Sequence, residues 1–214
     1  MKHADHAIFD RNTSIAEFLR AASARQATPG GGSVSALAGA LAAAMGEMVL
    51  NYSIGKKGLE IYQEDFHQAE SELRCARDML LMLMSEDQSA YAALTAARKL
   101  PDSPERAAKA SAALLGSIHT PQSMAATAVA VLQICERVMD FVNWHLLSDL
   151  AVCAELAMAT ARCAVYNVRV NLPDLSDEAD RKKIESDLDQ MLARGKELIQ
   201  RIIPHIWARH RQGP

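Results

Sequence analysis

Apolar residues recur three or four positions apart along almost the whole chain, which is the spacing of one face of an α-helix. The pattern predicts a short helix that starts near Ile15 and ends before Pro29, an alanine-rich helix over 33–51 and a long helix over 60–99. The glycines between 55 and 58 separate the second of these helices from the third.

Prolines indicate where the following helices begin and end. Pro101 ends the long helix, because a proline disfavours helical backbone in the residue before it. Ser103 and Pro104 have the residue types of an N-cap and a first helical turn, so a fourth helix is expected to start there. Pro121 is expected to start another helix, with Thr120 as its cap.

The stretch 122–171 contains neither glycine nor proline. A single helix of that length would measure about 75 Å, too long for one compact domain. We therefore expect a break between Asn143 and Ser148, with Ser148 as the N-cap of the new helix. A last amphipathic helix is predicted over 176–201, followed by a basic tail over 202–214 whose end, ARHRQGP (208–214), is expected to fray.

The composition favours helices throughout, because the 214 residues include 38 alanines. Alanine is the strongest helix former and a poor strand former, which excludes an all-β fold and disfavours a parallel sheet. We predict one all-α domain over 1–214, a multi-helix bundle whose helical core spans 13–201. The alanine- and glycine-rich helix over 33–51 is expected to be central, since small side chains let neighbouring helices approach closely.

Charge and hydropathy exclude several classes of protein. The formal net charge of −3 gives no sign of nucleic-acid binding, and the polar N-terminus lacks the apolar segment of a signal peptide. The apolar segment 34–50 includes Glu47 and is shorter than the roughly 20 residues that span a membrane. No nucleic-acid or membrane partner is therefore predicted.

The cysteines show no CxxC spacing and lie in apolar helical stretches, at positions 75, 135, 153 and 163. We interpret them as small buried hydrophobic residues of a cytoplasmic protein, with a disulfide pair as the alternative. No metal site is predicted, because the chain has no HExxH motif and no Cys/His cluster. His205 and His210 are interpreted as surface residues.

A carboxylate occupies a position where the long helix should be apolar. Steps of seven from Phe66 reach Leu73, Leu80, Asp87 and Leu94. Burying a carboxylate is costly unless it is paired, so Asp87 is a candidate for chemistry, and replacing it with leucine should then stabilise the fold. The alternative is a helix break near Ser85 that leaves Asp87 as an ordinary N-cap.

A second polar set lies on one face of the later helix. Alternating steps of four and three connect Asp149, Cys153, Leu156, Thr160, Cys163 and Asn167, and the 18 positions from the first to the last correspond to about 27 Å. Asp149 and Asn167 therefore cannot touch one reacting atom, but they could line a groove or meet residues of different subunits. Alternatively, Asp149 helps to cap its helix beside Ser148.

The segment Thr28-Pro-Gly-Gly-Gly-Ser33 runs directly into a helix. Glycines expose backbone N–H groups and a helix N-terminus adds partial positive charge, which suits an anion or a polar ring edge. It is neither a Walker loop nor a dinucleotide fingerprint. A plain helix–helix turn is the alternative. Lys56 and Lys57 follow at the other end of the same helix.

Together these fragments resemble the cyclodeaminase/cyclohydrolase family of folate enzymes. The matching pieces are TPGGGSVSALAGALAAAMGEMV, SIGKK, EDQSAY with ARKLP, HTPQSMA, the stretch from Asn143 to Leu150, and NVRVNL, all in the family's order between 28 and 172. Two stretches depart from the family: Val142-Asn-Trp-His145 replaces its usual Gly-Asn-x-Asn, and His119 replaces a small or apolar residue.

The resemblance implies an all-helical homodimer that binds reduced folate, with no further cofactor, in a groove near the subunit interface. It implies Asp87 and Asp149 as catalytic carboxylates. It also implies the substrate-binding residues Gly30, Gly31, Gly32, Ser33, Lys56, Lys57, Asn143, Ser148, Asn167 and Asn171, with the lysines or the glycine run holding the glutamate tail.

The family carries out two reactions on a carbon held between two folate nitrogens. One hydrolyses 5,10-methenyltetrahydrofolate to 10-formyltetrahydrofolate, and the other releases ammonia from formiminotetrahydrofolate. The first is favoured, because 214 residues leave no room for the transferase domain that normally accompanies the second. A binding or scaffold protein on the same fold is the alternative from another class.

Overall fold

The computed structural model describes residues 8–213, and every regular element among them is helical. The six α-helices are α1 (Ile15–Ala22), α2 (Gly31–Asn51), α3 (Gln63–Arg98), α4 (Pro104–Val138), α5 (Leu147–Arg169) and α6 (Glu178–Gln212). Three short 3-10 turns join them, η1 (Glu60–Tyr62), η2 (Trp144–Leu146) and η3 (Leu172–Asp174). The predicted all-α class is confirmed.

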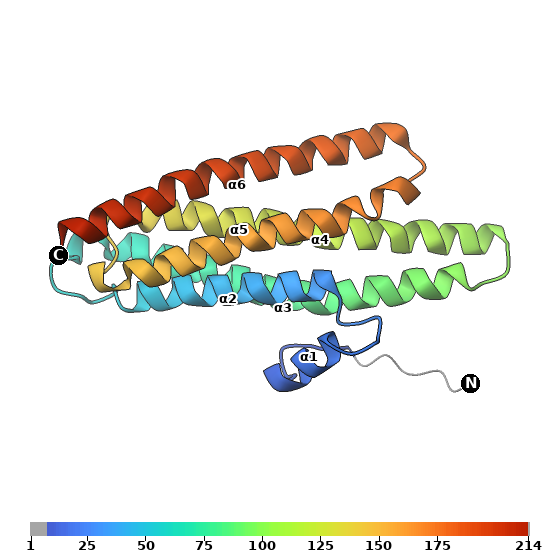
Figure 1. The fold of residues 1–214 in the computed structure, drawn as a ribbon, viewed down its shortest axis with the longest axis horizontal. Helices are drawn as coiled ribbons and strands as arrows, with labels where there is room; N and C mark the ends of the chain where they lie inside the picture. The colour runs from blue at the N-terminus through green and yellow to red at the C-terminus, as the bar shows by residue number, and fades with distance from the viewer. Residues whose placement is uncertain (1–7, 214) are drawn as a thin grey trace.

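Helices α2, α3, α4 and α5 run along one long axis, with α6 on the side of α4 and α5 and the short α1 on the opposite side (Figure 1). The core is divided along this axis. One cluster includes Leu50, Phe66 and Ile202, and the other includes Leu80 and Ile118, nearer the start of α2.

The small residues of α2 allow it to lie very close to α3 and α5, as predicted. A Cβ added to Gly46 would lie 2.8 Å from Leu73 Cδ1 and 3.1 Å from Cys153 Sγ, so the helices could not approach so closely with larger residues. Among the described residues, α2 is the one helix long and apolar enough to cross a membrane, and its packing explains that apolar character. Val34 and Leu41 remain exposed on one side, so α2 is not enclosed within a single chain.

The prediction of a helix start at Thr120-Pro121 is wrong, because α4 continues through Pro121. A proline in a helix lacks the N–H that would bond the carbonyl four residues earlier, here that of Ser117. Asn171 supplies the missing donor, since its Nδ2 lies 3.2 Å from the Ser117 carbonyl oxygen. The proline is therefore tolerated through a side chain from the segment after α5.

The break between Asn143 and Ser148 is confirmed, but the predicted N-cap is not. Leu146 occupies the N-cap position of α5, and Ser148 is an exposed residue inside its first turn. Asn143 caps the preceding turn η2 instead, accepting a hydrogen bond from the His145 N–H at 3.2 Å. The side chain that caps this break is therefore Asn143, at the start of η2, and not Ser148.

The predicted end of the helical core at residue 201 and the expected fraying of 208–214 are also wrong, because α6 extends to Gln212. Its inner face stays apolar there, and Ile206 is fully buried. Arg209 donates to the carbonyl oxygens of Met139 and Val142 at 2.9 and 2.7 Å. The end of α6 therefore holds the loop before α5, and Figure 1 shows it beside that loop.

Only two of the cysteines are buried, contrary to the interpretation of all four as core residues. Cys135 and Cys153 are buried with their sulfur atoms 3.4 Å apart, and all four are free thiols. Cys75 and Cys163 are exposed, because they lie on the outer faces of α3 and α5.

Candidate functional site

A cavity of about 370 Å³ lies where the N-terminus of α2 meets α3 and the C-terminal end of α5. Its walls come from the glycine run, from one face of α3, from Ser117 of α4 and from the last residues of α5 with Asn171. Pockets of several hundred Å³ are typical of small-molecule sites. Six of the predicted site residues, from widely separated parts of the chain, converge here.

Asp87 is the anionic side chain that lines this cavity. The hydroxyl of Ser33 donates to its Oδ2 at 2.8 Å, and the backbone N–H of Ser33 also donates to the carboxylate. Burial raises the pKa of Asp87, while the two hydrogen bonds from Ser33 oppose that rise. A carboxylate with a raised pKa is suited to exchange protons near neutral pH.

The carboxylate also completes the end of α2. Gly30 is the N-cap residue and has no side chain to bond the free N–H groups of the first turn. Asp87 bonds one of them from α3, where the partial positive charge of the helix N-terminus favours an anion. The alternative of a break near Ser85 is wrong, because α3 is continuous. The stabilisation predicted for Asp87→Leu does not follow either, because the carboxylate is paired.

The glycines of the run are needed for close approach. Among the described residues, none of Gly30, Gly31 or Gly32 has a positive φ. A Cβ on Gly32 would lie 2.0 Å from Asp87 Oδ1, and one on Gly31 would lie 3.2 Å from Asn167 Oδ1. Glycine therefore lets the backbone of α2 touch the two polar side chains of the cavity.

Two asparagines close the α5 side of the cavity. Asn167 Nδ2 donates to the Cys163 carbonyl at 2.8 Å, which turns its Oδ1 toward Gly31. Asn171 Nδ2 donates to the Asn167 carbonyl at 3.0 Å as well as to Ser117. The amide of Asn171 thus ties α4 to α5 beside the cavity.

A second group of predicted residues lies at the other end of α2. Lys56 Nζ donates to Asn143 Oδ1. The backbone N–H of Asn143 donates to Ser53 Oγ at 2.9 Å, and its Nδ2 donates to the Tyr52 carbonyl at 3.1 Å. Asn143 is therefore a buried connector between the end of α2 and the loop before α5.

The remaining predicted residues of this group are less enclosed. Lys57 and Ser148 are exposed, and Asp149 is half-buried in the first turn of α5. Among the described residues, no hydrogen bond from the Asp149 side chain caps that helix, so the capping alternative is wrong.

The predicted site residues therefore form two separate groups. Gly30, Gly31, Gly32, Asp87, Asn167 and Asn171 line the cavity, with Ser33 bonded to Asp87. Lys56, Lys57, Asn143, Ser148 and Asp149 do not line it. The 21 residues of α2 separate the two groups by about 30 Å. Within one chain, the two lysines cannot hold a group that is bound beside Asp87.

Several residues of the cavity wall were not predicted from the sequence. Tyr91, Thr95 and Arg98 lie four, eight and eleven residues after Asp87, on the same face of α3. That spacing could have found them. Ser117 could not have been found so easily, because it lies on α4, which carries none of the predicted site residues.

Other chemistry has little support. Residues 8–213 contain no group of three His, Cys, Asp or Glu side chains that could hold a metal ion. A larger cavity of about 580 Å³ lies between the end of α5 and the start of α6, but its charged side chains are largely paired with one another, as Arg169 is with Glu185. None of the predicted site residues lines it.

Comparison with known proteins finds matches over most of the chain. The family model described as formiminotransferase-cyclodeaminase matches residues 14–190. A protein of Methylorubrum extorquens named methenyltetrahydrofolate cyclohydrolase is 32% identical over 196 residues, which cover 89% of this chain and 94% of that protein. The mouse protein named formimidoyltransferase-cyclodeaminase is 29% identical over 203 residues, and the chain spans 38% of its length.

A solved structure has the same fold. The crystal structure of formiminotetrahydrofolate cyclodeaminase from Thermotoga maritima superposes with a TM-score of 0.86 at 28% sequence identity. The match covers 92% of this chain and 97% of that chain. The resemblance therefore extends over nearly the whole helical bundle.

Proposed function

The chain belongs to the formiminotransferase-cyclodeaminase family, and from this premise we propose that it is an enzyme that hydrolyses 5,10-methenyltetrahydrofolate to 10-formyltetrahydrofolate. The observation that carries the proposal is the pairing of Asp87 with Ser33 in a cavity beside the glycine run. The relative from Methylorubrum extorquens supports this reaction, because the match covers nearly all of both chains.

The substrate is a cation whose positive charge is shared by two nitrogens and the carbon between them. The Asp87 carboxylate stabilises this cation and accepts a proton from the water that attacks the carbon. It then returns the proton to the folate nitrogen at position 5 as the bond from that nitrogen to the carbon breaks. The new hydroxyl loses its proton to solvent and becomes the formyl oxygen. One water is consumed and one proton is released.

Ser33 and the N-terminus of α2 hold the carboxylate in place through this cycle. Their hydrogen bonds favour the ionised form, while burial favours the protonated form, so Asp87 can occupy both states. The amide oxygen of Asn167 faces the same space and suits the N–H groups of a pterin edge. No cofactor other than the folate enters this scheme.

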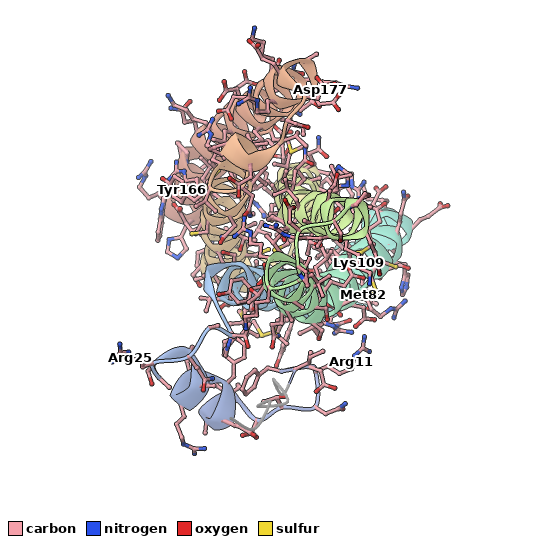
Figure 2. All side chains as sticks on the ribbon, turned by 90° about the vertical axis from the view of Figure 1, so that its right-hand side faces the viewer. Arg11, Arg25, Met82, Lys109, Tyr166 and Asp177 are labelled. Atoms are coloured by element: carbon pink, nitrogen blue, oxygen red, sulfur yellow. The ribbon has the colours of Figure 1, made fainter. Side chains whose placement is uncertain are left out.

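We propose that the working unit is a homodimer whose two copies join through α2 and α5. The outward faces of these helices carry exposed apolar residues: Val34, Leu41, Tyr52, Val152, Tyr166 and Val170. Figure 2 shows Tyr166 on one side of the bundle, and Met82 and Lys109 on the opposite side. An antiparallel pairing would bring Lys56 and Asp149 of one copy toward the Asp87 cavity of the other.

The dimer is tested by measuring the molar mass of the wild type and of Leu41→Glu by light scattering. The wild type should be dimeric and the variant monomeric, with the helical signal retained. A monomeric wild type would contradict the dimer. The four free thiols support a reducing, cytoplasmic location.

Formiminotetrahydrofolate cyclodeaminase is the second candidate function. The match to the Thermotoga maritima structure favours it, because that protein is named a cyclodeaminase and the match covers almost all of its chain. A protein of this size without a transferase domain in the same chain can therefore be named a cyclodeaminase. In this reaction the second folate nitrogen attacks the formimino carbon, and Asp87 would carry the proton of that nitrogen to the amino group, which leaves as ammonia.

Two assays on the purified protein distinguish the functions. The first follows the loss of methenyltetrahydrofolate absorbance, and the second measures ammonia release from formiminotetrahydrofolate. Rapid methenyl loss without ammonia release supports the hydrolase. Ammonia release with little methenyl hydrolysis identifies the cyclodeaminase. Saturable folate binding without turnover in either assay would contradict both and indicate a binding protein.

A further inference from the structure

The cavity has one cationic side chain, at the end of the wall formed by α3. Asp87, Tyr91, Leu94, Thr95 and Arg98 all line it, and they follow one another along a single face of that helix. The 11 residues from Asp87 to Arg98 correspond to about 16 Å along the helix axis. The wall therefore runs from a carboxylate, past an aromatic ring, to a guanidinium.

Arg98 is held in position by one ion pair, and most of its N–H donors remain available. Its Nη2 lies 2.5 Å from Asp174 Oδ2, in the turn η3 that follows α5. A guanidinium has five N–H donors, and among the described residues this is the one side-chain partner of Arg98. The side chain is 55% exposed, so its remaining donors can reach an incoming carboxylate.

The ring of Tyr91 lies one helical turn from Asp87, between the carboxylate and the guanidinium. The residue is 47% exposed although it lines the cavity, so its ring is accessible to a bound molecule. A flat aromatic group bound there would have Asp87 at one end and Arg98 at the other.

We propose that Arg98 binds the glutamate carboxylate of the folate substrate, with Tyr91 stacked on the aminobenzoyl ring and the one-carbon centre at Asp87. This inference rests on the proposed function and specifies how the substrate is oriented. It replaces the predicted role of Lys56 and Lys57 within one chain, since neither lines the cavity.

The matched control is Arg74, also on α3. It is paired with a carboxylate, Glu70, at 3.2 Å, and its side chain is 51% exposed, but it lies outside the cavity. Arg98→Gln and Arg74→Gln therefore remove the same charge from similar environments. Arg98→Lys keeps the charge and removes the planar fork that binds a carboxylate through two donors.

The experiment measures kcat and KM for methenyltetrahydrofolate and for the analogue that lacks the glutamate. Arg98→Gln should raise KM for the complete substrate about 10–100-fold, since a hydrogen bond to a charged group is lost, with kcat within about twofold. Arg98→Lys should show a smaller rise, and Arg74→Gln none. On the analogue, Arg98→Gln and the wild type should have the same KM.

Equal KM values for Arg98→Gln and Arg74→Gln, or equal losses on both substrates, would overturn the proposal. Direct titration with tetrahydrofolate separates this failure from failure of the proposed function. If the wild type binds but does not turn over, the function is wrong, and the dissociation constants of Arg98→Gln and Arg74→Gln still decide the role of Arg98. A wild type that binds no folate overturns both.

Discussion

Gly32→Ala should displace the proposed catalytic carboxylate with a single methyl group. The added Cβ would lie 2.0 Å from Asp87 Oδ1 and 2.5 Å from its Cγ, whereas real Cβ atoms essentially never come closer than 3.0 Å to another heavy atom. The carboxylate must therefore move by about 1 Å or more. Such a shift takes it out of hydrogen-bond range of Ser33 Oγ, which is now 2.8 Å away.

The expected cost has two parts. Losing a hydrogen bond to a charged group costs about 1.5–3 kcal/mol of folding free energy, which corresponds to a Tm lowered by roughly 3–12 °C in a chain of this size. Misplacing a catalytic group by about 1 Å lowers kcat roughly 100-fold. Circular dichroism melting and the methenyl absorbance assay measure the two effects.

A graded series of alanine variants provides the controls. Gly31→Ala, whose Cβ would lie 3.2 Å from Asn167 Oδ1, should have an intermediate effect. Gly116→Ala, which meets only Ala90 Cβ at 3.7 Å, should behave like the wild type. Wild-type kcat and Tm in Gly32→Ala would refute the argument from close approach, because the carboxylate could then move without consequence.

Four further predictions test other parts of the structure. Because burial raises the pKa of Asp87 above its unfolded value, kcat/KM should rise as pH increases through the folded pKa. Over the same pH range the wild type should lose stability relative to Asp87→Asn. A difference in urea unfolding free energy between the two proteins that stays constant with pH would contradict this. Asn171→Ala should lower the free energy of unfolding by about 1 kcal/mol in the wild type. The loss should be smaller in Pro121→Ala, because the new N–H of residue 121 can bond the Ser117 carbonyl; additive effects in the double-mutant cycle would show that Asn171 does not compensate for Pro121. Arg209→Met should lower the free energy of unfolding by about 2 kcal/mol and speed amide hydrogen exchange in the loop before α5. Unchanged exchange rates would show that α6 does not hold that loop. Because the proposed dimer brings Asp149 toward the Asp87 cavity of the other copy, Asp149→Asn should fold normally and lose most turnover, and full kcat would show that Asp149 takes no part in the reaction.

The fold was predictable because apolar residues recur every three or four positions along nearly the whole chain. Apolar spacing placed the helices, and it also exposed Asp87 as the exception on α3, which the structure confirms as the carboxylate of the cavity. The glycine run was predicted as part of the site, but for an incomplete reason. Backbone freedom is a local property, whereas the contact of Gly32 with Asp87 joins residues 55 positions apart and needs the folded bundle.

The wrong predictions also concern partners distant in sequence. Pro121 has the local features of a helix start, and α4 continues through it while Asn171 bonds the freed carbonyl. The basic end of the chain has the composition of a frayed tail, but Arg209 finds two carbonyl acceptors about 70 residues earlier. Trp144, one of the residues that depart from the family pattern, stacks on His210 of the same helix end.

The division of the site into two groups could not be predicted from helical spacing. The sequence indicates that Asp149 and Asn167 lie far apart on one helix, but not which of them shares a cavity with Asp87. The structure places Asn167 there and leaves Asp149 near Lys56 at the opposite end of α2. The proposed dimer is the arrangement in which both groups could serve one substrate.

The most direct test of the central claim is the initial rate of methenyltetrahydrofolate hydrolysis by the wild type and by Asp87→Asn, measured side by side at saturating substrate. Asparagine keeps the shape of the side chain and can still accept the hydrogen bonds of Ser33, so Tm should change by only a few degrees. If Asp87 is the catalytic carboxylate, the wild type should turn over rapidly and the variant should have a kcat at least about 100-fold lower. A folded Asp87→Asn protein with kcat within twofold of the wild type would contradict that role.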